Sequence, residues 1–227
     1  MIVKIDILTL FPEMFDGFIG TSIIKRAIDL GKVDIKVHNF RDYSLDKHKK
    51  VDDYPYGGGS GMILMCEPIF RCLDKIKTED SLVIMMSPSG KVFKQDIARD
   101  LSKKKHLIFL CGHYEGFDER ILSIVDMQLS IGDYVLTGGE VPAMVITDAI
   151  TRLIPGVISS ESLLSESFND GLLDYPNYTR PEEFRGMRVP DVLLSGHHEN
   201  IRKYREEERI KRTKEVRCDL DGGDLHE

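Results

Sequence analysis

The sequence predicts an α/β protein built around a mostly parallel β-sheet that is covered by helices. Short runs of β-branched and apolar residues alternate along the chain with longer segments whose apolar residues recur at helical spacing. Such alternation is typical of strands joined by crossover helices, which place neighbouring strands parallel. Glycine-rich turns follow three of the predicted strands, and open α/β sheets bind ligands at that end of their strands.

The elements follow one another in a regular order. The first predicted strand, residues 2–10, precedes a helical pattern at residues 11–30, in which Pro12 lies where a first helical turn tolerates it. Gly31 is expected to end this helix. Apolar runs predict further strands at residues 33–40, 82–86, 106–111 and 127–131. Helical spacing predicts further helices at residues 67–76, 93–103, 119–125 and 140–153.

The pattern changes in the last third of the chain. Residues 154–181 are rich in serine, proline, asparagine and glycine and have little periodicity, which is typical of a linker or a functional loop. A small helical unit is expected beyond it, with its main helix at residues 199–217. We therefore expect a domain over residues 1–160, a flexible interdomain loop over 161–181 and a helical domain over 182–227.

Composition narrows the class of protein. The 227 residues are 41% hydrophobic and 30% charged, as in ordinary soluble domains, and no apolar stretch is long enough to span a bilayer. The first residues lack the basic flank and cleavage site of a signal peptide, so we expect a cytoplasmic protein. The four cysteines form no C-x-x-C pair, which argues against a structural zinc site or a disulfide framework. Cys111, within an apolar run, is expected to be buried.

Charge excludes one class of nucleic-acid protein and leaves another open. A net charge of −7 argues against a general nucleic-acid coat protein, but an RNA enzyme needs only local basic surfaces. Residues 47–50 are three lysines and a histidine, and residues 202–217 carry eight Lys or Arg against four Glu. Taken alone, the second group is best interpreted as a solvated helix with Glu–Lys and Glu–Arg pairs.

The three glycine turns, residues 87–90, 111–116 and 131–140, predict one shared pocket. Glycine lets the backbone approach a ligand closely, and these turns occupy corresponding places after successive strands. Gly90-Lys91 lacks the following Ser or Thr of a phosphate-binding P-loop, and no G-x-G-x-x-G motif opens a helix. A nucleoside-type ligand without an essential phosphate group remains.

A fourth glycine cluster, residues 52–62, follows no clear strand. Its glycine density alone is typical of a flexible surface loop. Its two tyrosines and proline also suit a platform that stacks an unpaired base, next to the positive charges of residues 47–50.

Eight segments in order along most of the chain resemble the bacterial tRNA (guanine-N1)-methyltransferases, members of the knotted SPOUT methyltransferases. They are LFPEMF (10–15), VDDYPYGGGSGM (51–62), SPSGK (87–91), CGHYEGFDER (111–120), IGDYVLTGGEVPA (131–143), RLIPGV (152–157), SFNDGLLDYPNYTRP (167–181) and VLLSGHH (192–198). The resemblance implies a deep trefoil knot, S-adenosylmethionine as methyl donor, and an obligate homodimer whose active site uses both subunits. The family's substrate is tRNA, at the guanine immediately 3′ of the anticodon.

The resemblance also assigns binding residues. Those expected to contact the methyl donor lie in or beside the three turns: Met86, Ser87, Pro88, Gly90, Gly112, Tyr114, Glu115, Gly116, Ile131, Gly132, Asp133, Tyr134, Val135, Leu136, Gly138, Gly139 and Pro142. Those expected near the target nucleotide are Tyr56, Gly57, Gly58, Gly59, Gly61 and Arg180. Residues 1–160 would then be the knotted, donor-binding catalytic domain. Residues 182–227, with the basic helix at 202–217, would bind tRNA.

Catalysis at guanine N1 asks for a carboxylate base and a cation that stabilises charge on O6. Arg152, in RLIPGV, matches the family's catalytic arginine. The family's base is an aspartate just before Ser-Phe, and this sequence has Glu166 there instead. Asp170 is the alternative base, and Asp174 matches a family acid near donor and target. Glu115, Glu166 and Asp174 could together hold a Mg²⁺ ion, because hard cations prefer oxygen ligands.

Two other functions stay open. One is a knotted methyltransferase that modifies a ribose hydroxyl or another base, against which the pairing of Arg152 with Glu166 and the GGGSG loop weigh. The other is a catalytically inactive RNA- or nucleotide-binding protein, which would be favoured if the acid were dispensable.

Overall fold

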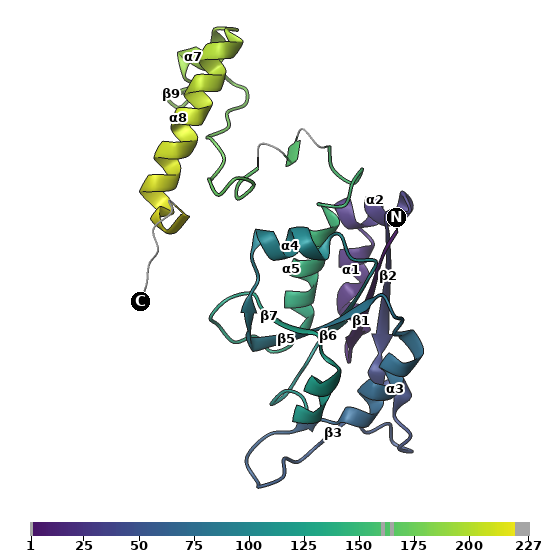
Figure 1. Ribbon diagram of the computed structural model, residues 1–227. Helices are drawn as coiled ribbons and strands as arrows, with labels where there is room; N and C mark the ends of the chain where they lie inside the picture. The colour runs from purple at the N-terminus through teal and green to yellow at the C-terminus, as the bar shows by residue number, and fades with distance from the viewer. Residues whose placement is uncertain (1, 160–161, 164–165, 221–227) are drawn as a thin grey trace. The chain divides into compact units, whose positions relative to one another are not determined.

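The computed structural model divides the chain into two compact units, Met1–Ile158 and Ser159–Glu227. It describes residues 2–159, 162–163 and 166–220. Figure 1 shows the elements of both units, and each unit is considered by itself. The glycine turns belong to the first unit, and the predicted carboxylate base belongs to the second.

The first unit is built on a five-stranded sheet in which every strand pairing is parallel. In the order β2-β1-β6-β5-β7, its strands are β2 (Val33–Asn39), β1 (Val3–Thr9), β6 (His106–Leu110), β5 (Ser81–Val92) and β7 (Met127–Ser130). The predicted α/β class with a mostly parallel sheet is confirmed. Because β6, β5 and β7 are neighbours, the glycine turns that follow the predicted strands come together at one edge of the sheet.

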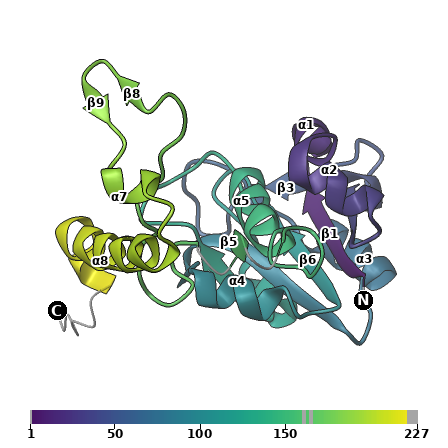
Figure 2. The same ribbon diagram turned by 90° about the horizontal axis from the view of Figure 1, so that it is seen from above.

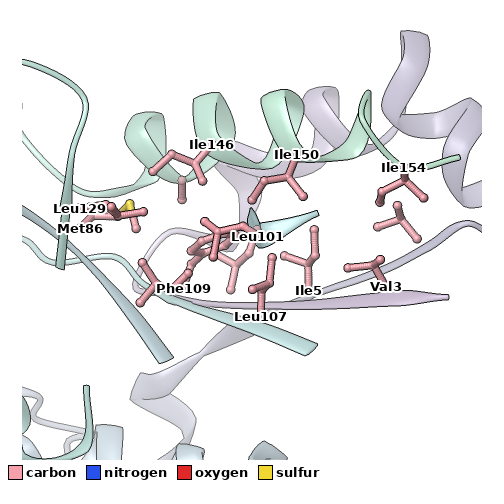
Figure 3. Close-up of a cluster of buried hydrophobic side chains, with 14 of the residues drawn as sticks. Val3, Ile5, Met86, Leu101, Leu107, Phe109, Leu129, Ile146, Ile150 and Ile154 are labelled. Carbon is pink, nitrogen blue, oxygen red and sulfur yellow. The ribbon is translucent and has the colours of Figure 1, made fainter. Parts of the chain in front are cut away.

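Helices α2 (Ser22–Asp29), α4 (Gln95–Leu101) and α5 (Glu140–Thr151) cover one face of the sheet (Figures 1 and 2). In Figure 3, Ile146 and Ile150 of α5 lie over the strand residues Leu107 and Phe109, all within one buried cluster. Burial of α5 on the sheet explains the apolar residues Ala143, Ile146 and Ile150 on one side of the helix. It also fixes the start of the helix beside the turn after β7.

The opposite face is covered by α3 (Cys66–Ile76) and the 3₁₀ helix η3 (Glu119–Ile124). Val83 and Ile108 point to this face, whereas their neighbours Ile84 and Leu107 point to the other. Strands buried on both faces need an unbroken apolar sequence rather than an alternating one. That is why these segments were predicted as continuous apolar runs.

Two helical predictions are wrong in detail. Residues 11–30 form η1 (Pro12–Phe15), α1 (Asp16–Ile19) and α2 instead of one helix. The break is at Thr21, whose backbone is extended and whose hydroxyl donates a hydrogen bond to the carbonyl of Gly17 at 2.6 Å. A threonine hydroxyl competes with the helix backbone in this way. Residues 119–125, predicted as an α-helix, form the tighter η3.

Smaller elements complete the first unit. The 3₁₀ helix η2 (Phe40–Tyr43) follows β2, and β3 (Asp52–Asp53) pairs antiparallel with β4 (Ile63–Leu64). The fourth glycine cluster is therefore the connection of a short hairpin. Its glycines Gly57, Gly58, Gly59 and Gly61 all have positive φ angles, which glycine adopts without strain.

The second unit contains β8 (Glu183–Phe184), β9 (Met187–Arg188), α7 (Asp191–Leu194), α8 (His198–Val216) and the 3₁₀ helix η4 (Cys218–Leu220). The main helix predicted at residues 199–217 is confirmed as α8. The hairpin of β8 and β9, which Figure 2 shows clearly, was not predicted. Its two-residue turn has positive φ at Arg185 and Gly186, the geometry of a type I′ turn, but arginine is an unusual residue at the first of these positions.

Candidate active site

A cavity of about 630 Å³ lies at the carboxyl ends of β5, β6 and β7. The three glycine turns form its walls, with Met86, Gly112 and Gly139 among the residues that line it. Its volume is in the range of pockets that hold small organic ligands. The cavity is therefore a ligand-sized site made by segments that are far apart in the sequence.

Nearly all of the residues predicted to contact the donor line this one cavity. They are Met86, Ser87, Pro88, Gly112, Tyr114, Glu115, Gly116, Ile131, Gly132, Tyr134, Val135, Leu136, Gly138, Gly139 and Pro142. Gly90 and Asp133 are not among the lining residues. The sequence thus indicated which side chains and backbone segments the fold gathers at one place.

Gly90 has a different place from the one predicted. Met86 and Lys91 both pair with Leu129 of β7, so residues 87–90 loop out of β5 and the strand then resumes. A Cβ atom on Gly90 would lie only 2.5 Å from the backbone nitrogen of Leu129. Glycine is needed at this position because β5 and β7 pass very close to each other. The loop of residues 87–90 places Ser87 and Pro88 in the wall of the cavity. The prediction that the strand ends at residue 86 is wrong.

The second and third glycine turns are joined by their backbones. Gly139 N donates a hydrogen bond to the carbonyl of Gly112 at 2.9 Å, and His113 forms a bridge with Gly138. A Cβ atom on Gly139 would lie 2.7 Å from Cys111 Cα. The two turns can approach this closely only because this position has no side chain. They form a single wall of the cavity.

A buried carboxylate supports this wall from behind. Glu140, the first residue of α5, is 1% exposed. Its Oε1 accepts a hydrogen bond from the hydroxyl of Thr9 at 2.5 Å, and its Oε2 lies 2.7 Å from His113 Nε2. The His113 ring packs on Phe11, with ring centroids 4.6 Å apart. A negative charge at a helix N-terminus is also favoured by the helix dipole.

The tyrosine–glycine loop, residues 54–61, adjoins the cavity. Glu115 N donates to the carbonyl of Met62 at 3.0 Å, and a Cβ atom on Gly61 would lie 2.5 Å from Glu115 Cγ. Tyr54 and Tyr56 are fully or largely exposed. The loop predicted to lie near the target nucleotide therefore ends beside Glu115, a residue that lines the cavity.

Arg152 does not lie at the cavity of its own chain. It follows the last residue of α5, whereas Pro142, which lines the cavity, lies in the first turn of that helix. Ten residues of α-helix separate Arg152 from Pro142, about 15 Å along the helix axis. One copy of the first unit thus keeps the predicted catalytic arginine away from its own cavity.

The predicted acids of the second unit differ in their partners. Asp170 forms an ion pair with Arg209, with 2.5 Å between Oδ1 and Nη2. The hydrogen bond from Arg209 lowers the pKa of Asp170 below its ordinary value, so this carboxylate is a weaker base. Asp174 accepts hydrogen bonds from Tyr175 N at 2.8 Å and Asn177 Nδ2 at 3.1 Å, which fix the turn that follows it. The carbonyl of Glu166 accepts a hydrogen bond from Asn169 N at 3.3 Å.

Two arginines in the segment predicted to face RNA form ion pairs within the second unit. The Arg209 side chain is 15% exposed and also bonds Glu206, and Arg217 bonds Asp219 at 2.7 Å. Arg209 and Arg217 are therefore engaged by acidic side chains of this unit. Arg180, predicted to bind substrate, borders a separate cavity within this unit.

Sequence reasoning missed several residues of the site. Thr9, His113 and Glu140 were not singled out, and neither was Gln128, which accepts a hydrogen bond from Ser89 Oγ at 3.3 Å. Polar residues such as Gln128 and Ser130 within the short strand β7 were the available signal, because a doubly covered strand is otherwise apolar.

The expectations about a metal site, the burial of Cys111 and membrane-spanning helices can be compared with the described residues. Over residues 2–159, 162–163 and 166–220, no three His, Cys, Asp or Glu side chains are placed to hold a metal ion. Cys111 is buried as predicted, and burial raises the pKa of its thiol. In the described part of the chain, no helix combines the length and the apolar character that a membrane span requires.

Fold and site together define the class: an open, parallel α/β protein with a ligand-sized cavity at the carboxyl ends of its strands. The family model of the tRNA (Guanine-1)-methyltransferase TrmD matches residues 3–222. The chain belongs to this tRNA (guanine-1)-methyltransferase family.

Curated relatives agree with this family. Relatives named tRNA (guanine-N(1)-)-methyltransferase include one from Dictyoglomus turgidum, 59% identical over 218 residues, covering 96% of this chain and 89% of the relative. Another, from Staphylococcus carnosus, is 57% identical and covers 96% of this chain and 90% of the relative. A third, from Clostridium novyi, is 58% identical and covers 97% and 92%.

Proposed function

We propose that this protein transfers a methyl group from S-adenosylmethionine to N1 of the guanine immediately 3′ of the anticodon in tRNA. Family membership supports the reaction class. The observation that carries the proposal for this chain is the single cavity made by three glycine turns, with the tyrosine–glycine loop beside it. We propose further that the sheet carries the family's trefoil knot and that the enzyme is cytoplasmic.

The cavity suits an adenosyl ligand. Backbone N–H and C=O groups of the turns can read the edge of a purine, while Met86, Leu136 and Pro142 offer apolar surface to its ring. The bound donor supplies a methyl group made electrophilic by its sulfonium. The protein's task is to hold that carbon in line with the attacking nitrogen, because alignment of two reactants removes much of the entropic barrier.

Glu166 and Arg152 are the proposed acid–base and electrostatic groups. As guanine N1 forms its bond to the methyl carbon and the carbon–sulfur bond breaks, Glu166 takes the N1 proton. Arg152 stabilises the negative charge that builds on O6. The ion pair of Asp170 with Arg209 argues against Asp170 as the base. Asp174 is proposed to lie near donor and target.

A second copy of the chain is proposed to complete the site. Arg152 lies at the far end of α5 from its own cavity, and a two-fold partner can bring its Arg152 to this cavity. Apolar side chains on α5 and η1 are also exposed, among them Val141 at 46%, Val145 at 45% and Met14 at 45%. Exposed apolar residues on neighbouring elements are typical of an interface.

The tRNA is proposed to contact both units. Tyr56 and the glycines of its loop would hold the target nucleotide beside the donor cavity, and Arg180 and the second unit would bind other parts of the molecule. An exposed aromatic ring beside a glycine-rich backbone can stack a base that has left its helix.

Methyl transfer from labelled S-adenosylmethionine to two tRNA transcripts tests the function. One transcript carries guanine 3′ of the anticodon and the other adenine at the same position. We expect incorporation into the first alone, with the product identified as N1-methylguanine by nuclease digestion. Equal incorporation into both would indicate a methyltransferase with another target atom, and incorporation into neither would indicate a binding protein without this activity.

A role for Mg²⁺ is a separate proposal. Of the acids suggested for it, Glu115 belongs to the first unit and Glu166 and Asp174 belong to the second. Activity measured against added Mg²⁺ after chelation, with unmodified tRNA folded beforehand, decides whether the ion acts on the enzyme.

A further inference from the structure

We propose that the second unit has a nucleotide-binding pocket of its own, which takes an unpaired base of the tRNA together with a neighbouring phosphate. This inference rests on the proposed function. A cavity of about 560 Å³ lies between the segment at residues 175–182 and the helices α7 and α8. Its lining residues come from three segments of this unit, so the pocket is formed by the unit itself.

The floor of this pocket is apolar, and its sides include an aromatic ring and the plane of a guanidinium group. Val189, Leu193 and Ile201 are partly buried beneath it. The ring of Tyr178 is 48% exposed, and the Arg205 guanidinium lies 4.6 Å from the centroid of the Tyr175 ring. Tyr175 thus orients the guanidinium by a cation–π contact. An exposed tyrosine ring and an oriented guanidinium plane are the two kinds of surface on which proteins stack unpaired bases.

The charge at the rim favours a nucleotide over an apolar peptide. Arg180 and Arg205 both line the pocket, and in the part of the chain that the structure describes neither is paired with an acidic side chain. Glu182, the acid among the lining residues, is instead paired with Arg188 at 3.4 Å. Arg209 and Arg217 on the same helix are paired with acids, so Arg205 differs from them. A phosphate beside the stacked base would supply the missing anionic partner.

Substitutions at Tyr178 test stacking in the complete enzyme. We expect Tyr178→Leu to raise KM for tRNA about tenfold, since stacking of one base contributes on that scale. Tyr178→Phe keeps the aromatic ring and should recover most of this loss. Phe184→Leu is the matched control, because Phe184 is 55% exposed in the same unit and does not line the pocket. A KM for Tyr178→Leu equal to that of Phe184→Leu would overturn the proposal.

Fluorescence gives a readout that does not require methylation. The chain has no tryptophan, so Tyr178→Trp introduces one reporter, and Phe184→Trp introduces the control. Unmodified tRNA added without donor should quench the first variant strongly and the second little, because a stacked base quenches indole. Absence of quenching at saturating tRNA would also overturn the pocket. If the unmodified enzyme methylates no tRNA, the proposed function fails, and the quenching result still decides whether the pocket binds RNA.

Discussion

At the scale of single residues, the partners of each carboxylate determine what it can do. Glu140 has both oxygens engaged, by Thr9 and His113, and it is buried behind the cavity wall. A carboxylate so placed can align α5 and the turn after β6, but it has no path to a substrate proton. Asp170 is held by Arg209, which stabilises its charged form. These environments argue against Glu140 and Asp170 as the base, and Glu166 stays the proposed one.

Single-turnover methyl transfer compares the two candidate bases. We expect Glu166→Gln to lower the rate constant by about 10²–10⁴, the usual contribution of a general base. Asp170→Asn should reduce it far less, because that side chain's role is to pair with Arg209. If Asp170→Asn loses the rate while Glu166→Gln keeps it, Asp170 is the base.

The environment of Asp6 predicts how the free energy of unfolding depends on pH. The carboxylate of Asp6 is 3% exposed, and its two oxygens each lie 2.6 Å from a ring nitrogen, of His38 and of His106. Burial raises the pKa of Asp6, but the hydrogen bonds and charges of both histidines lower it more, so the net shift is downward. Asp6 therefore stabilises the fold above the ordinary aspartate pKa of about 3.9, and this contribution is lost as pH falls through its lower folded-state pKa.

Urea unfolding of Asp6→Asn between pH 3 and 7 measures this contribution. We expect the variant to be less stable at neutral pH by about 1–3 kcal/mol, because an amide leaves one buried imidazole N–H without an acceptor. Its stability should also fall less steeply than that of the unsubstituted chain below pH of about 4. Asp100→Asn, at an exposed ion pair with Lys103, is the control and should change little. Parallel pH profiles for Asp6→Asn and the unsubstituted chain would exclude this role for Asp6.

At the scale of elements, local chemistry decided which predictions succeeded. The strands and glycine turns were predictable because an apolar run or a glycine affects the backbone at its own position in the sequence. Parallel strands then bring their carboxyl ends to one edge of the sheet. The loop at residues 87–90, which interrupts β5, was not predictable, because it depends on pairing with Leu129, far along the chain. The contact of His113 with Glu140 spans 27 residues, and no periodic pattern relates the two. The break at Thr21 coincides with a side-chain hydrogen bond and with a positive φ angle at Ser22, neither of which helical periodicity reports.

Gly139→Ala tests the joined wall of the cavity. Its new Cβ would meet Cys111 Cα at 2.7 Å and Gly112 N at 2.9 Å, both backbone atoms that can yield only if the turns move apart. We expect the Kd for S-adenosylmethionine to rise at least tenfold, measured by isothermal titration calorimetry, because the wall loses its geometry. Gly17→Ala, with no atom within 4 Å of the new Cβ, is the control. Unchanged affinity in Gly139→Ala would show that this wall does not contact the donor.

At the scale of the whole molecule, the sequence could not place Arg152. The resemblance named it as catalytic, yet the chain keeps it at the opposite end of α5 from the cavity it is expected to serve. Residue patterns describe one chain, and a site completed by a partner leaves no periodic trace in it. The exposed apolar residues Val141 and Val145 support the proposed second copy, because exposed apolar side chains are typical of an interface.

Subunit complementation tests whether Arg152 acts on the partner's cavity. One variant, Arg152→Ala, keeps its cavity intact, and the other, Gly139→Ala, keeps Arg152 but has a disrupted cavity. Each alone should be nearly inactive when the donor concentration is kept well below the raised Kd of Gly139→Ala. Mixed by joint refolding in equal amounts, they should recover about a quarter of full activity, since half of the dimers pair unlike subunits and each of those has one complete site. If Arg152 served its own cavity, the mixed dimer would contain no complete site, and mixing would restore nothing.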